Sequence, residues 1–282
     1  MKQTLALLFL CSTLGLAQQD STAVPTGPWT HSVVAGLTLT QVAFKDWSQG
    51  GENALSYALA LDGSSKRKGE EVDWANNYKF AFGQTRLGSQ GLKKTDDKID
   101  LESVLTYKLG TYVNPYGAAT FKSQFATGYK YDDATGVKTP VSKFFDPAYL
   151  TQSIGVGYQP APEIKTRLGA ALREIITSVY TQYADDPSTT TVEKTSVKGG
   201  FESVTNVEWK VGENMLFTAK LELFSAFDKL DQVIVRSDNT LAAKVNKYVS
   251  VIVNVQLINE RAVTPRTQVK QTLGLSLSYQ LL

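Results

Sequence analysis

The chain has 282 residues, with 29 Lys and Arg, 27 Asp and Glu, one His and one Cys, and its formal net charge is +2. A charge so close to balance argues against a nucleic-acid partner, which would need a strongly basic surface. A single histidine leaves little scope for acid–base or metal chemistry, so we expect no enzymatic activity and no cofactor.

The N-terminus has the pattern of a cleaved export signal. Lys2 supplies a positive start, Leu5 to Leu10 an apolar core that is too short to span a bilayer, and Gly15-Leu16-Ala17 a small-residue cleavage site. We therefore predict a signal peptide over residues 1–17, a short periplasmic segment over 18–28 and one domain over 29–282.

From Trp29 onward, apolar residues recur at every second position, which indicates β-strands. Leu273, Leu275, Leu277 and Tyr279, for example, alternate with Thr, Gly and Ser. Most such segments are longer than strands of soluble domains and long enough to cross a bilayer when tilted. The pattern predicts twelve strands, at 29–44, 52–62, 71–87, 97–109, 115–130, 148–159, 164–176, 197–210, 215–227, 232–245, 247–258 and 268–281.

The predicted connections alternate between short and long. Four are tight (110–114, 160–163, 211–214 and 246–247), and three longer, more polar ones lie between them (88–96, 131–147 and 181–196). Short periplasmic turns and long external loops are typical of outer-membrane barrels. Two connections fit this less well, because 63–70 should be short and 45–51 should be long. We predict an all-β, antiparallel, up-and-down transmembrane β-barrel of about 12 strands, in preference to a soluble β-sandwich.

Aromatic residues gather near the strand ends, as expected where rings meet the headgroup layer. One set falls near the predicted periplasmic rim: Trp29, Tyr107, Tyr158, Trp209, Phe217, Tyr248 and Tyr279. A second set falls towards the other rim: Phe44, Phe82, Phe125, Tyr129, Phe201 and Phe227.

Charged residues alternate with the apolar ones and would point into the barrel. The candidate lumen-lining residues are Lys79, Lys98, Asp100, Glu102, Lys122, Arg167, Arg173, Glu202, Lys220, Glu222, Arg236 and Lys270. The same register adds Lys108, Lys165, Glu208, Asp238 and Lys244 to this face, which gives it a basic surplus.

Several other motifs carry little chemistry. His31 lies near the start of the first strand with no G-x-S-x-G element, so a role beside Trp29 at the rim is favoured over catalysis.

The pairs Asp96-Asp97, Asp132-Asp133 and Asp185-Asp186 lack calcium-loop spacing and are predicted to be solvated loop acids, or to bridge lipopolysaccharide phosphates through divalent cations. Gly50-Gly51 predicts a turn with positive φ. Lys66-Arg67-Lys68 is predicted to be a solvated charge run in a connection.

Several stretches resemble an uncharacterised family of predicted outer-membrane barrels from Bacteroidetes, a domain of unknown function. The residues that carry the resemblance are Leu37 to Ser56, Trp74 to Asn77, Lys93 to Leu105, Phe121 to Tyr131 and Phe144 to Tyr158. The resemblance implies the fold and the location, and it brings no catalytic or binding residues.

Two functions stay open at this point. The basic surplus favours a narrow, weakly anion-preferring channel for ions or small solutes. The alternative is a closed structural or surface-interaction barrel with a salt-bridged lumen, and an outer-membrane hydrolase is disfavoured by the single histidine. The expected partners are outer-membrane lipid, lipopolysaccharide and, during insertion, the barrel-assembly machinery.

Overall fold

The computed structural model describes residues 28–44, 51–132, 134–261 and 263–282. The predicted signal peptide and nearly all of the predicted segment 18–28 lie outside these residues. The strands are β1 (Trp29–Val42), β2 (Ala54–Lys68), β3 (Val72–Leu87), β4 (Lys93–Tyr107), β5 (Val113–Ser123), β6 (Gly128–Tyr131), β7 (Lys138–Ser142), β8 (Ala148–Ala161), β9 (Ile164–Ile176), β10 (Thr195–Gly212), β11 (Met215–Ala226), β12 (Val233–Lys244), β13 (Val249–Asn259) and β14 (Gln268–Gln280). A short 3-10 helix, η1, spans Thr181–Tyr183, and no helix in the described part of the chain is long and apolar enough to cross a membrane.

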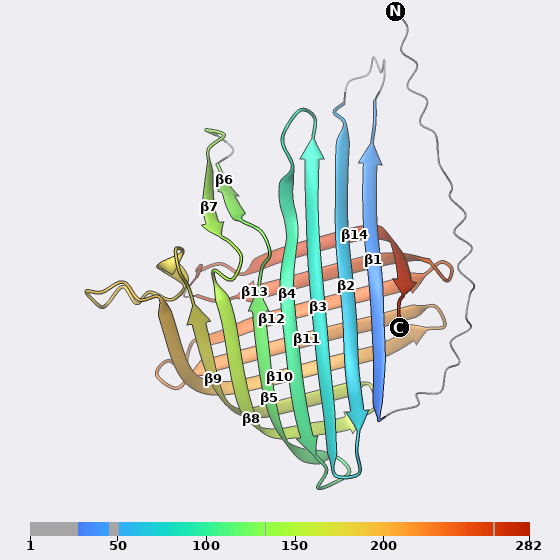
Figure 1. The fold of residues 1–282 in the computed structure, drawn as a ribbon, viewed down its shortest axis with the longest axis vertical. Helices are drawn as coiled ribbons and strands as arrows, with labels where there is room; N and C mark the ends of the chain where they lie inside the picture. The colour runs from blue at the N-terminus through green and yellow to red at the C-terminus, as the bar shows by residue number, and fades with distance from the viewer. Residues whose placement is uncertain (1–27, 45–50, 133, 262) are drawn as a thin grey trace, which may run out of the picture.

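Twelve of the strands form one closed antiparallel barrel (Figure 1). Each strand pairs with its sequence neighbour, except that β5 pairs with β8 because β6 and β7 form a separate two-stranded sheet. The ring closes where Val34–Thr38 of β1 pair with Ser276–Gln280 of β14. Strands on the near wall cross those on the far wall steeply, as the tilt of a barrel requires. The predicted all-β, twelve-strand, up-and-down barrel is confirmed.

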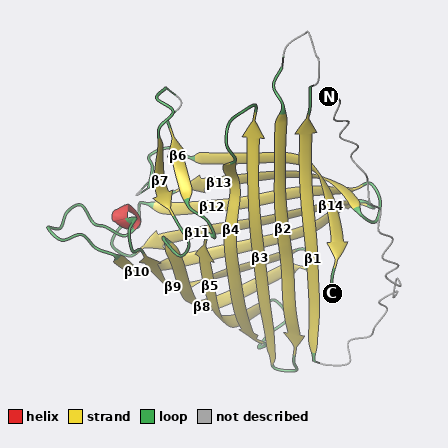
Figure 2. Ribbon diagram, turned by 45° about the horizontal axis from the view of Figure 1, so that its top comes forward, coloured by secondary structure: helices red, strands yellow, loops and turns green. Residues whose placement is uncertain are grey.

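The two ends of the barrel carry connections of different length (Figure 2). One end has only short turns between strands, at 69–71, 108–112, 162–163, 213–214 and 245–248. The other end has the connections 43–53, 88–92, 124–147, 177–194, 227–232 and 260–267. We call these the short-turn end and the long-loop end.

The prediction that 63–70 is a connection is wrong, because β2 continues to Lys68 and the turn is Gly69 to Glu71. In the extension 63–68, the residues on the outward face are polar or glycine. The alternation of apolar and polar residues that predicts a strand is therefore absent there. Gly63 is required here, since a Cβ on it would lie 1.9 Å from the Tyr78 ring. The ring of Tyr78 therefore covers the space that a larger residue would occupy.

The basic run Lys66-Arg67-Lys68, predicted to lie in a connection, is part of β2.

A second correction concerns the predicted strand 115–130 and the predicted loop 131–147. The barrel strand β5 stops at Ser123, and Gly128–Tyr131 pairs with Lys138–Ser142 to form a hairpin beyond the barrel rim. At the break, the side-chain amide of Gln124 donates to the carbonyl of Pro147 at 3.2 Å. The alternating pattern predicted one strand here because the segments on both sides of the break are β-strands.

The outer wall is apolar and the inner face is polar. Leu273, Leu275 and Leu277 of β14 are 56–74% exposed, whereas Ser276 between them is 3% exposed. On β8, Ile154 is 71% exposed and its neighbour Ser153 is 5% exposed. Tyr107, Tyr158, Trp209, Tyr248 and Tyr279 are exposed near the short-turn end, as the predicted aromatic belt requires. In water such a wall would be unfavourable, so the barrel is built for an apolar surrounding.

Candidate functional site

The site with the densest chemistry is the lumen. Of the twelve predicted lumen-lining residues, eleven take part in ion pairs: Lys98, Asp100, Glu102, Lys122, Arg167, Arg173, Glu202, Lys220, Glu222, Arg236 and Lys270. The twelfth, Lys79, lies in register opposite Asp62 on β2 and Asp100 on β4. They come together because every second residue of a strand faces the same side and the ring is closed.

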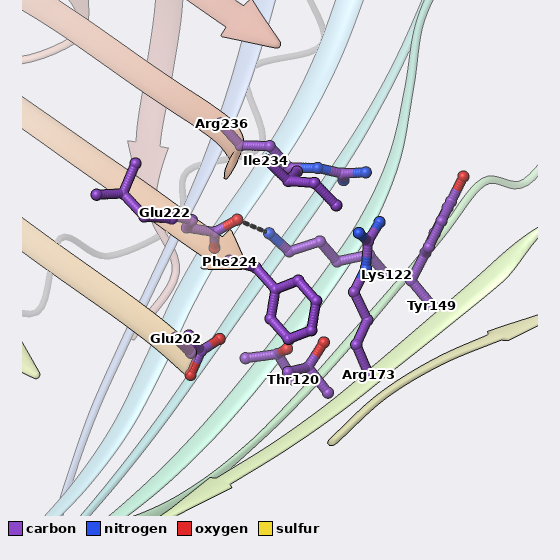
Figure 3. A pocket seen from close by; sticks show the side chains of 11 residues that line it. Thr120, Lys122, Tyr149, Arg173, Glu202, Glu222, Phe224, Ile234 and Arg236 are labelled. Carbon is purple, nitrogen blue, oxygen red and sulfur yellow. Dashed lines mark hydrogen bonds and ion pairs between the residues drawn. The ribbon is translucent and has the colours of Figure 1, made fainter. Parts of the chain in front are cut away.

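A central network links four barrel strands. Glu102 of β4 accepts from the Arg167 guanidinium of β9 at 2.6 Å, and its second oxygen lies 3.4 Å from Lys220 Nζ of β11. Lys220 also lies 3.0 Å from Glu222 on its own strand, and Glu222 accepts from Lys122 of β5 (Figure 3). Glu102 and Arg167 are both buried. Each charge in this network therefore has an opposite charge in place of water.

One ion pair joins opposite walls of the barrel. Lys98 Nζ of β4 lies 3.0 Å from Asp238 Oδ2 of β12, and Asn254 donates to the other oxygen of Asp238 at 2.7 Å. In the strand order, β4 and β12 are six places apart in either direction around a ring of twelve. This side-chain contact between diametrically opposite strands therefore spans the lumen at that level.

Nearer the long-loop end, two guanidinium groups share one carboxylate. Glu260, which directly follows β13, accepts from Arg173 and Arg236 at 2.8 Å each. Both guanidinium groups also lie over the Tyr149 ring, at 5.5 and 5.2 Å from its centroid. A cavity of about 50 Å³ lies beside this group, bounded also by Lys122 and Glu222 (Figure 3). Such a space has room for a few water molecules.

Three acids of the lumen were missed in the sequence analysis, because each lies at a misjudged strand end. Asp62 closed the predicted second strand, Asp96 was placed in a loop, and Glu260 followed the predicted end of its strand. Asp96 in fact lies on β4 and pairs with Lys270 at 2.8 Å. These acids reduce the basic surplus that favoured an anion channel.

The other singled-out residues have structural roles. His31 stacks on Trp29, 6.3 Å between ring centroids, and its Nδ1 lies 2.8 Å from the Ser65 hydroxyl, as expected of a rim histidine. Gly51 has φ +129°, which fits the predicted turn, while Gly50 lies outside the described residues.

Residues of the predicted acidic pairs accept hydrogen bonds from backbone N–H groups and, at Asp97, from a lysine. Asp97, predicted to be solvated, has a side chain only 4% exposed, and it accepts from the N–H groups of Phe125 and Ala126 and from Lys94. Asp132 accepts from the N–H groups of Ala134 and Thr135, while Asp133 lies outside the described residues.

A buried acid that the sequence did not single out ties two long loops together. Asp146, 1% exposed, accepts from the N–H groups of Ser178 and Val179 at 3.1 and 2.7 Å. In the connection 177–194, the Thr189 hydroxyl and the Asp186 N–H donate to Glu193 and lower the pKa of that carboxyl to about 2. The connection 177–194 is therefore a built element with its own hydrogen bonds.

The ring of twelve strands has an apolar outer wall and a charged, ion-paired interior. This is the class of β-barrel that resembles outer-membrane barrels. Residues 39–129 match a family model described as "Protein of unknown function (DUF3078)". This agrees with the predicted resemblance to a family of unknown function, while the lineage of that family stays a prediction. No curated protein sequence matches the chain significantly.

Several solved barrels are similar in structure at low sequence identity. The translocator domain of the autotransporter NalP from Neisseria meningitidis is 10% identical with a TM-score of 0.40, covering 92% of this chain and 90% of that one. An outer membrane channel from Pseudomonas putida F1 is 12% identical with a TM-score of 0.40, covering 93% and 97%. The NanC porin is 9% identical with a TM-score of 0.35, covering 88% and 97%.

Proposed function

We propose that this chain is an outer-membrane β-barrel whose lumen is closed by ion pairs, and that it has a structural or surface-interaction role through its long loops. The observation that carries closure is the Lys98–Asp238 pair at 3.0 Å between opposite strands. The exposed leucines of β14 and the difference between the two ends support a barrel set in a bilayer, with the short-turn end in the periplasm. Outer-membrane lipid and lipopolysaccharide are then the partners of its outer wall.

The competing function is the narrow, weakly anion-preferring channel. It needs an unpaired basic lining, whereas the bases of the central network each lie beside a carboxylate. A solute would have to separate these pairs in a low-dielectric interior, which is costly. We therefore favour the closed barrel. An absence of enzymatic activity is also part of this proposal.

Conductance of the folded protein in a planar bilayer tests closure. We expect silence from the wild type and conductance steps from the double variant Lys98→Ala/Asp238→Ala, which removes the contact between opposite walls. The matched control is Lys108→Ala/Asp73→Ala, because that 2.8 Å pair joins the neighbouring β3 and the residue after β4 near the short-turn end. The control should stay silent.

Reproducible steps from the wild type, with a reversal potential that shows anion preference in a salt gradient, would overturn closure and favour the channel. In that case Arg167 and Lys220 are the first charges to reverse, because they lie in the central network.

A further inference from the structure

A second cavity lies in the lumen mouth at the long-loop end. It has a volume of about 80 Å³ and lies where β9 to β12 meet the connections 227–232 and 260–267. It is distinct from the 50 Å³ cavity near Glu222, although Arg173, Phe224 and Ile234 contribute to both. The central ion-pair network lies deeper in the barrel. The cavity therefore opens towards the long loops.

Its polar walls are basic. Arg173, Lys198, Lys229 and Arg261 line it, and none of the described residues that line it is acidic. Arg173 is held by Glu260 at 2.8 Å. The nearest carboxylate partner of Lys198 is Asp228 at 3.9 Å, a distance at which two exposed groups attract each other weakly. An anion entering the cavity would meet several cations that it can contact directly.

The floor of the same cavity is apolar. Phe224, Ala226 and Ala171 form a buried cluster inside the lumen, and Ile234 packs against it. Phe224 projects inward from β11, where alternation places Lys220 and Glu222 on the same face (Figure 3). The Arg173 guanidinium lies 5.7 Å from the Phe224 ring centroid. An apolar floor beneath basic walls is the composition of a small-ligand site with an oriented anionic group.

We propose that this pocket binds a small organic anion, with its carboxylate against Lys198, Lys229 and Arg261 and its apolar part against Phe224 and Ile234. A simple inorganic anion would leave the apolar floor uncovered, and a neutral apolar molecule would gain no attraction from the cations. A volume of about 80 Å³ excludes a peptide or a lipid with several acyl chains, so the ligand is small and only partly enclosed. The ligand enters from the long-loop end, because the cavity opens there.

The experiment is a titration of the full-length folded barrel in detergent micelles with 4-fluorobenzoate, followed by ¹⁹F NMR and corrected with empty micelles. We expect saturable binding that unlabelled benzoate displaces, and that acetate or benzyl alcohol at equal concentration displaces at least tenfold less well. Lys229→Met/Arg261→Met should weaken binding at least tenfold, because both residues are exposed loop cations of the pocket wall. Lys130→Met, on the β6–β7 hairpin and outside the pocket, is the control and should leave binding unchanged.

No saturable binding, or equal weakening by Lys130→Met, would overturn the proposal. Displacement by acetate as effective as by benzoate would show a purely electrostatic site and would overturn the role of Phe224 and Ile234. These outcomes are independent of the proposed closure, because binding is measured in micelles and closure as conductance in a bilayer.

Discussion

The side chains of the central network show how a barrel interior can hold many charges at close quarters. Glu102, Arg167 and Lys220 are removed from bulk water, and each is compensated by an opposite charge across the lumen. Removing one member of such a network leaves its buried partners with less compensation, which costs more than losing an exposed pair.

Arg167→Met should therefore destabilise the barrel by about 3 kcal/mol, because Glu202 would lose the cation 4.0 Å from it and Glu102 would keep Lys220 alone. Lys198→Met is the control, since its pair with Asp228 is 3.9 Å long and exposed, and it should change stability by less than about 1 kcal/mol. Urea-induced unfolding from lipid vesicles measures both. Similar midpoints for the two variants would contradict the compensating role of Arg167.

Substitutions on the two faces of β11 should differ in cost. Leu221 is outward and exposed, so Leu221→Arg near mid-membrane should cost ~2–4 kcal/mol of folding free energy, while Thr218→Arg on the inward face should cost much less. The same unfolding measurement decides this. Equal losses would mean that the lipid-facing assignment is wrong.

Individual strands depend on contacts that reach across to the next strand. Where β2 passes β3, Gly63 lies opposite Tyr78, and the tyrosine hydroxyl lies 3.2 Å from Ser65. This arrangement of a glycine beneath an aromatic ring lets β2 continue for six residues without apolar side chains of its own on the outward face. Packing against the neighbouring strand therefore supports this part of β2, which lacks an alternating apolar pattern of its own.

Gly63→Ala should destabilise the barrel by about 1–2 kcal/mol, because the new Cβ would lie 1.9 Å from the Tyr78 ring. In a Tyr78→Ala background the same substitution should cost little, and a double-mutant cycle measures the difference. An unchanged cost in that background would show that the ring contact is not the reason for the glycine.

The loop 177–194 should respond to pH through Glu193. Its pKa of about 2 lies below the ordinary value of 4.5, so its contribution to loop order is complete above pH 4.5 and is lost as pH falls through about 2. Thr189→Val removes the 2.6 Å hydrogen bond and should raise this pKa towards its ordinary value. A ¹³C NMR titration of the Glu193 carboxyl measures the shift, with Thr264→Val in another loop as the control. A Glu193 pKa that does not move in Thr189→Val would contradict this assignment.

The whole molecule is held by a ladder of twelve strands that closes on itself. The seam between β1 and β14 is its shortest pairing in the barrel, with five residue pairs from Val34–Thr38 to Ser276–Gln280. A closed ladder resists unfolding because no strand can leave it without breaking hydrogen bonds to two neighbours. The stability of the barrel to detergent therefore depends on this seam.

Unboiled and boiled samples should migrate differently in detergent electrophoresis. Leu277→Pro removes an N–H at the seam, where Leu277 pairs with both Leu37 and Val249, and should abolish the difference. Lys138→Pro, on β7 outside the barrel ring, should preserve it. Co-migration of boiled and unboiled wild type would contradict the closed ladder.

The sequence by itself determined the class of fold and most of the strands, because the period-two pattern depends only on which residues neighbour one another along the chain. The same alternation assigned Lys98, Arg167 and Lys220 to the inward face. It failed at strand ends such as Asp62 and Gly128, where the outward residues are not apolar or where a hairpin follows the barrel strand.

Only the tertiary structure decided how the lumen is filled. The partners Lys98 and Asp238 are 140 residues apart, and no local pattern specifies which charges meet across a ring. The pairing depends on register, tilt and closure together, because these set the height at which each inward side chain projects. The basic surplus therefore suggested a channel, whereas the geometry of the ion pairs supports a closed barrel with a basic pocket at its mouth.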